Sequence, residues 1–402
     1  MLETLDQTDW SALDDAYGPS VATPGRIRDL ASSNKSKRDK ALDELSYTIY
    51  HQGTIYPASV AAIPFLLEIA ASSEVADRAP TLQILQALST GSSYHEAHAS
   101  LFFNREKSKT AEWQENVREE KSWVSAIREQ LSAAVPLIAQ VLEAGALPER
   151  LAAVSLLATL QDNPAAVRAL AGATLDPSAE LSAAAISAVG ARPEVQVELL
   201  EQSFKRAANE LVRTVAAIQI LCHRNRDASP AAIEYLLNHL RTPQSEIRKA
   251  YEDLPDVGAF LGDLGKALAS APRSAAETAF PLLYEQVKQS GHPLNWSETF
   301  GVLILAVTLN PPSDRDWSKV TLTQPQRLAI RLVADRAWRI ERGAPTTHLN
   351  IVDLLGSVGL PQKREEIFAL LAGTPEAQTP QEEAKWSAKT KRRPWWRFWK
   401  EG

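Results

Sequence analysis

The sequence has little cysteine, methionine or histidine: one, one and seven residues among 402. Cys222 can therefore form no disulfide within the chain, and no cysteine cluster is present to bind zinc. A lone cysteine fits a reducing cytosol. No apolar run approaches the roughly 20 residues of a transmembrane helix, and the acidic first ten residues carry no secretory h-region. We therefore expect a cytoplasmic protein.

Glycine is also scarce, with 17 residues, and runs of strand-forming residues are missing. Alanine and leucine instead recur at helical spacing, which predicts an all-α fold. Because one compact core rarely grows beyond roughly 250–300 residues, a chain of this length requires several domains or a stacked array.

Three similar phrases indicate a stacked array. Each phrase opens a predicted helix with a glutamate followed by apolar residues, and their anchors Leu151, Leu181 and Leu211 are evenly spaced along the chain. Such internal repetition is typical of solenoids, in which a helical hairpin buries its apolar face only against its neighbours.

The clearest repeat unit runs from Leu175 to Gly190. Asp176 is expected to cap its helix, Pro177 to occupy the first turn, and Gly190 to close the helix in the left-handed conformation. The apolar side chains that then share one helical face are Leu181, Ala185, Ile186 and Val189.

This unit resembles the second helix of a HEAT repeat. The stretches from His51 to Leu66 and from Leu322 to Arg364 look like those of an uncharacterised bacterial HEAT-repeat family. The resemblance covers about residues 8–372. It implies a right-handed α-solenoid of HEAT-like hairpins that serves as an interaction module, in some relatives beside toxin or defence systems.

Charge and composition divide the chain into three parts: a solenoid over 1–372, a flexible linker rich in Pro, Glu, Gln and Thr over 373–384, and a basic tail over 385–402. The tail has seven basic residues and one glutamate, a net charge of +6. Since the whole chain carries −6, the rest carries −12. An acidic body disfavours nucleic acid and favours a protein partner with a basic surface.

Two motifs contain histidine, and each is better explained by a structural role than by a functional site. His95 and His98 are spaced to share a helical face, but no third metal ligand is nearby. The stretch from His51 to Pro57 is better explained as a turn between helices, with Gly53 at positive φ and Pro57 starting the next helix.

Cys222 is expected on the apolar face of its helix, buried and inert. We therefore predict no catalytic residue, no metal and no cofactor.

Aromatic residues gather among the charges between Tyr94 and Trp123. Exposed tryptophans commonly dominate binding surfaces, yet large aromatics also pack long helices together, and the sequence leaves both roles open. The candidate protein-binding residues are Phe102, Phe103, Trp113 and Trp123.

The tail combines tryptophans with lysines and arginines, a pattern typical of peripheral attachment to anionic membranes. A peptide that docks in a partner's groove and a strip that folds back on the solenoid remain alternatives. The residues concerned are Arg392, Arg393, Trp395, Trp396, Arg397, Phe398, Trp399 and Lys400.

Together these features predict a non-enzymatic protein-binding scaffold, in the setting of bacterial immunity or defence that the resemblance implies. An alternative is a HEAT-like DNA glycosylase, since some HEAT-like solenoids hold DNA in a basic groove. The acidic body provides no evident basic groove.

Overall fold

The computed structural model describes residues 1–99, 104, 106–160, 162–192, 197–224, 228–290, 296–309, 311, 317, 320–341 and 344–372. Within these residues the chain folds into α-helices with three short β-hairpins, which confirms the predicted all-α class. The fold is consistent with an α-solenoid. The helices form two compact units, Met1–Val195 with Leu254–Asp256, and Gln196–Asp253 with Val257–Gly402.

The first unit contains helices α1 to α10 and two hairpins. Its helices are α1 (Thr23–Leu30), α2 (Lys35–Thr48), α3 (Pro57–Ala71), α4 (Ala79–Ser89), α5 (Tyr94–His98), α6 (Ala111–Ala133), α7 (Val135–Ala144), α8 (Leu147–Thr159), α9 (Pro164–Ala173) and α10 (Ala179–Gly190). Short 3₁₀ helices cover Leu5–Gln7, Trp10–Ala12 and Lys107–Lys109. The strands are β1 (Asp14–Asp15), β2 (Gly18–Pro19), β3 (Tyr50–His51) and β4 (Thr54–Ile55).

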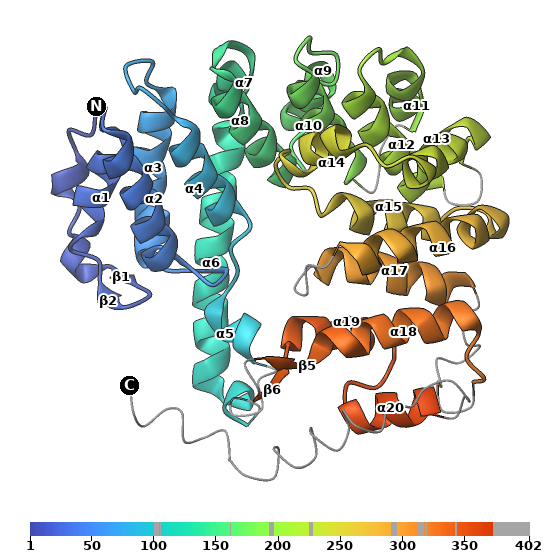
Figure 1. Cartoon of the computed structure of the whole chain (residues 1–402). Helices are drawn as coiled ribbons and strands as arrows, with labels where there is room; N and C mark the ends of the chain where they lie inside the picture. Colours follow the sequence, from blue (N-terminus) through green and yellow to red (C-terminus); the bar gives the residue numbers. More distant parts are fainter. Residues whose placement is uncertain are drawn as a thin grey trace. The chain divides into compact units, whose positions relative to one another are not determined.

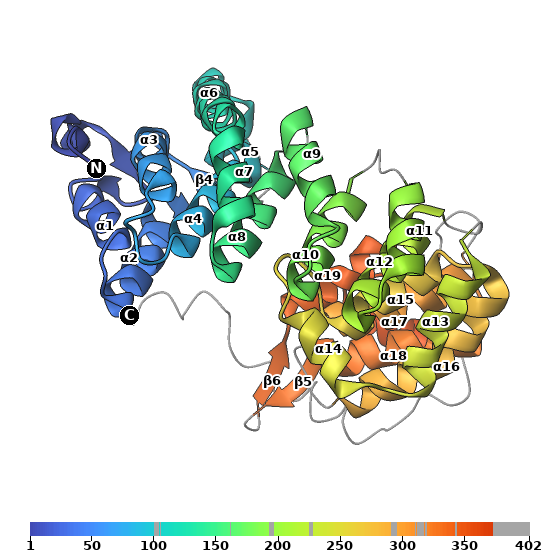
Figure 2. The ribbon, with the colours of Figure 1, turned by 90° about the horizontal axis from the view of Figure 1, so that it is seen from above.

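Its helices pack in two rows, as expected for stacked hairpins. Helices α1, α3, α7 and α9 contact one another in sequence along one row, and α2, α4, α8 and α10 do so along the other (Figure 1, Figure 2). Each helix of the first row also pairs with the next helix of the second row. The pair α5 and α6 is inserted between α4 and α7, with α6 against both α3 and α4.

The repeat phrases mark real helix starts, but three details of the predicted unit are wrong. Pro177 precedes the cap and lies outside the first turn, because α10 begins at Ala179. The cap of α10 is Ser178, whose hydroxyl accepts a hydrogen bond from the amide of Leu181. Asp176 instead forms an ion pair with Arg150 from α8. Gly190 remains helical and is not among the residues with positive φ, so the helix ends without a left-handed residue.

The connection from His51 to Pro57 is the turn that the sequence predicted, with an added feature. Gln52 and Gly53 both have positive φ, 51° and 88°, which is the backbone that a two-residue hairpin loop requires. The flanking residues pair as β3 and β4, and Pro57 begins α3. Pairing between these strands was not foreseen, because each is only two residues long.

The second unit contains α11 to α20 and one hairpin. Its elements are α11 (Val197–Arg206), α12 (Glu210–Arg224), α13 (Pro230–Arg241), α14 (Ser245–Glu252), α15 (Phe260–Ala269), α16 (Arg273–Gln289), α17 (Trp296–Leu309), α18 (Gln324–Ala337), β5 (Trp338–Glu341), β6 (Ala344–Thr347), α19 (Leu349–Ser357) and α20 (Arg364–Ala372).

This unit also has two rows, although its sequence departs most from the repeat pattern. Helices α12, α15, α17 and α19 contact in order along one row, and α13, α16, α18 and α20 along the other. Glycines lie at the crossing between α15 and α17. A Cβ atom on Gly265 would lie 2.7 Å from the carbonyl carbon of Gly301, and one on Gly301 would lie 2.7 Å from the carbonyl oxygen of Gly262.

Gly301→Ala is therefore expected to destabilise the second unit by about 2 kcal/mol, because the added methyl group meets backbone that can yield only if the helices separate. Urea unfolding followed by circular dichroism measures this. Gly172→Ala is the control, since nothing lies within 4 Å of its added Cβ atom. The control should be neutral or more stable by up to about 1 kcal/mol. Equal stabilities of Gly301→Ala and the parent chain would contradict this packing.

Candidate functional site

The structure places two of the four predicted protein-binding aromatics on α6. Trp113 is buried, with 9% of its surface exposed, and Trp123 is half-buried. Trp113 therefore has the packing role that the sequence left open. Phe102 and Phe103 lie outside the described residues, as do the linker and the whole tail, residues 373–402.

Trp113 packs beside a histidine–glutamate pair that joins α5 to α6. The rings of His95 and Trp113 meet edge to face, 4.5 Å between centroids. The buried carboxylate of Glu120 accepts hydrogen bonds from the hydroxyl of Ser93 and the backbone amide of His95, at 2.6 and 2.9 Å. Its other oxygen lies 2.6 Å from His95 Nδ1. These bonds anchor the short helix α5 on α6.

His98 does not join this pair in a metal site. Its Nδ1 lies 2.8 Å from the carbonyl oxygen of Tyr94, within its own helix. Over the part of the chain that the structure describes, no three His, Cys, Asp or Glu side chains are grouped to hold a metal ion. In the same part, no helix is long and apolar enough to cross a membrane.

Cys222 is exposed, so the prediction that it is buried was wrong. Its helix α12 still buries Leu211, Val215 and Ile218, but the cysteine lies off that face. Protein atoms nevertheless surround the thiol on enough sides that burial, with the nearby negative charge of Asp263, raises its pKa to about 11. The thiol is therefore protonated at neutral pH.

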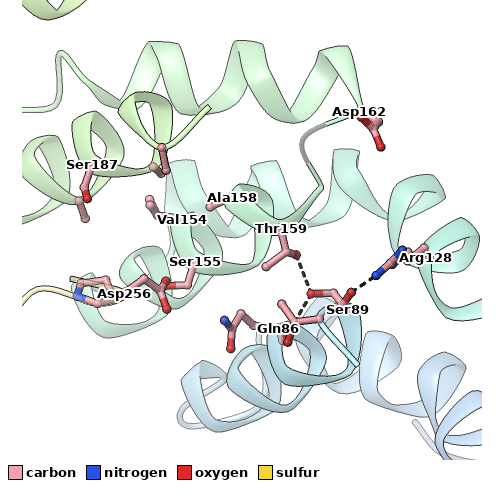
Figure 3. A pocket seen from close by; sticks show the side chains of 15 residues that line it. Gln86, Ser89, Arg128, Val154, Ser155, Ala158, Thr159, Asp162, Ser187 and Asp256 are labelled. Atoms are coloured by element: carbon pink, nitrogen blue, oxygen red, sulfur yellow. Dashed lines mark hydrogen bonds between the residues drawn. The ribbon is translucent and has the colours of Figure 1, made fainter. Parts of the chain in front are cut away.

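The first unit contains a pocket of about 550 Å³ on its second row of helices (Figure 3). The C-terminal halves of α4, α8 and α10 form its walls, with Arg128 of α6 and the loop residues Asp162, Pro255 and Asp256. The remaining lining residues are Gln86, Ser89, Thr90, Val154, Ser155, Ala158, Thr159, Ala184, Ser187, Ala188 and Ala191.

One side of the pocket is held by a small hydrogen-bond network. The hydroxyl of Ser89 donates to the Thr159 hydroxyl, 2.6 Å away, which ties the end of α4 to the end of α8. The Nε of Arg128 lies 3.4 Å from the carbonyl oxygen of Ser89, to which it donates. These bonds leave the positions of the walls well defined.

Several other polar side chains face the pocket without using their hydrogen-bonding capacity. Among the described residues, no hydrogen bond or ion pair satisfies the side chains of Gln86, Ser155, Asp162, Ser187 or Asp256. Ser155 is the most enclosed of these residues, with only 8% of its surface exposed. The pocket thus offers acceptors and donors to a ligand.

Sequence reasoning missed this pocket. Its residues come from positions 86 to 256, and most are serine, threonine or alanine, which are common at any close helix contact. The available signal was the enrichment of small residues in the repeat helices.

No protein-family model matches the chain, and no protein of curated function matches its sequence. Among solved structures, the crystal structure of an engineered protein is matched over 92% of this chain and 99% of its own, with 13% identity and a TM-score of 0.29. A similarity this low assigns no function.

Proposed function

We propose that this chain is a non-enzymatic, HEAT-like helical scaffold that binds a protein partner. The observation that carries the proposal is the set of unsatisfied polar side chains around the pocket of the first unit. An extended peptide presents backbone N–H and C=O groups at regular intervals, and hydroxyls and amides along a groove can pair with both. A rigid row of helices supports such a groove at fixed spacing.

The proposed partner has a basic surface. The chain before the tail carries −12, and the pocket has two carboxylates, those of Asp162 and Asp256, against the single guanidinium of Arg128. This balance favours a cationic protein surface over DNA, whose phosphates require clustered cations. By resemblance alone, we place the scaffold in a bacterial immunity or defence setting.

Site-specific photo-crosslinking tests this function. A photoreactive residue at Ala188, in the pocket, should capture a discrete protein in the cells that naturally make the chain. The same residue at Asp29, exposed on α1, should not. Adducts with nucleic acid at Ala188, together with base release from damaged duplex DNA, would contradict the scaffold function and favour a DNA glycosylase. Equal capture at both positions would show that the partner does not bind at the pocket.

We also propose that the tail, residues 385–402, contacts anionic membrane. Each basic residue near such a surface contributes about 1 kcal/mol, an attraction that salt weakens, whereas buried indoles contribute an apolar part that salt does not weaken.

Full-length protein should therefore co-sediment with anionic vesicles, less so but measurably at high salt. Replacing Trp395, Trp396 and Trp399 together with alanine should abolish the binding that remains at high salt. Neutral vesicles are the control. Equal sedimentation of the parent and the triple variant with anionic vesicles at high salt would contradict membrane insertion of the tail.

A further inference from the structure

The two ends of the pocket differ in charge. In Figure 3, Arg128 and Asp162 lie at one end, where an acid accompanies the one cation among the described lining residues. Asp256 lies at the opposite end, toward Ser155 and Ser187. The Asp256 carboxylate has no cationic partner among the described residues. This end therefore has an uncompensated negative charge.

One surrounding helix adds to the negative potential at this end. Ser187 lies in the last turn of α10, whereas the last residue of α8, Thr159, bonds to Ser89 at the Arg128 end. Helix C-termini carry partial negative charge, which basic residues in the last turn commonly offset. The last turn of α10 has no basic residue. At α4, by contrast, Arg128 donates to the carbonyl of Ser89 and supplies a positive charge.

Hydrogen-bond acceptors are available at the same end. The hydroxyls of Ser155 and Ser187 have lone pairs that no described group uses, and Ser155 is more than nine-tenths buried. A hydroxyl on an enclosed residue near an exposed carboxylate suits a group that donates several hydrogen bonds and carries positive charge. A primary ammonium or a guanidinium meets both requirements.

We infer that the Asp256 end of the pocket binds a lysine or arginine side chain from an extended segment of the partner protein. This inference rests on the proposed function, because it names what the pocket recognises. The ammonium or guanidinium group pairs with Asp256 and donates to Ser155 and Ser187. The alanines Ala184 and Ala188 line the same pocket and leave room for the aliphatic part of the side chain.

The backbone at Asp256 allows a clean substitution. Asp256 has a φ of 58°, in the left-handed region that aspartate and asparagine tolerate better than other residues with a side chain. Asp256→Asn therefore removes the charge and keeps both the shape and the backbone preference. Asp29→Asn on α1 is the matched control, since Asp29 is an exposed acid that does not line the pocket.

The test uses the full-length protein and labelled peptides that differ only at the central residue, which is lysine, arginine, norleucine or glutamate. Fluorescence anisotropy should show lysine and arginine peptides binding about tenfold tighter than the norleucine peptide, the gain typical of one charge-assisted contact. Glutamate should bind least. The preference should decrease with salt, be lost in Asp256→Asn and persist in Asp29→Asn.

Two results would overturn the inference. Peptides that bind without regard to charge, or with a charge preference that Asp256→Asn leaves intact, would refute the cation site while leaving peptide binding by the scaffold in place. Failure of all four peptides to bind would also refute it, and the proposed function would then depend on the crosslinking result at Ala188. Unchanged unfolding midpoints of both variants would show that lost binding is not lost folding.

Discussion

Ile186→Asp is expected to destabilise the first unit by about 5 kcal/mol, because it removes a buried side chain and places a charge where none can be hydrated. Ile186 has no exposed surface and lies on the face of α10 that packs against α8 and α9. Natural domains are stable by only about 5–15 kcal/mol, so the variant should be largely unfolded at moderate urea concentrations. Urea titration followed by far-ultraviolet circular dichroism measures the shift.

Leu181→Asp should behave alike, since Leu181 lies in the same helix and is equally buried. Glu180→Ala is the control at the exposed neighbouring position, with an expected change within about 0.5 kcal/mol. A midpoint shift for Ile186→Asp no larger than that of the control would show that the buried face of α10 is misassigned.

Glu149→Gln should cost about 3 kcal/mol at neutral pH, because it breaks a largely buried ion pair and leaves Arg78 without its counter-charge. Glu149 accepts bonds from the amide, Nε and Nη2 of Arg78 at 3.0, 3.0 and 2.7 Å, and from the amide of Ala146 at 3.1 Å. The pair joins the start of α4 to the start of α8. Glutamine keeps the size and one acceptor of the side chain, so the measured loss reports chiefly on the charge.

This loss should depend on pH in one direction. The hydrogen bonds from Arg78 lower the pKa of Glu149 below that of an unfolded glutamate, about 4.3. The stabilisation is therefore complete above that value and disappears as the pH falls through the lowered pKa. Parent and variant should differ most at pH 7 and converge in strong acid. Glu180→Gln, at an exposed acid, should match the parent throughout. A difference that stays constant from neutral to acid pH would contradict the ion pair.

The candidate site was less predictable than the fold. The aromatic residues between Tyr94 and Trp123 stood out in the sequence, yet Trp113 is buried beside His95, where it packs two helices together. Composition cannot separate an exposed tryptophan from a packed one, because both follow from the same apolar ring. The pocket, in contrast, is lined by residues too common to stand out.

The sequence by itself determined the helical class, the repeating helix starts and the turn at Gly53, because periodicity, proline position and glycine backbone freedom act between residues close in the chain. The tertiary structure decided which distant groups meet. Arg78 and Glu149 pair across 71 positions, and Asp176 bonds to Arg150 instead of capping its own helix. Gly265 and Gly301 lie against each other where two helices cross, and Gln86 and Asp256 line the same pocket although they are far apart in the chain. No local pattern encodes such meetings, because they depend on how the rows of helices stack.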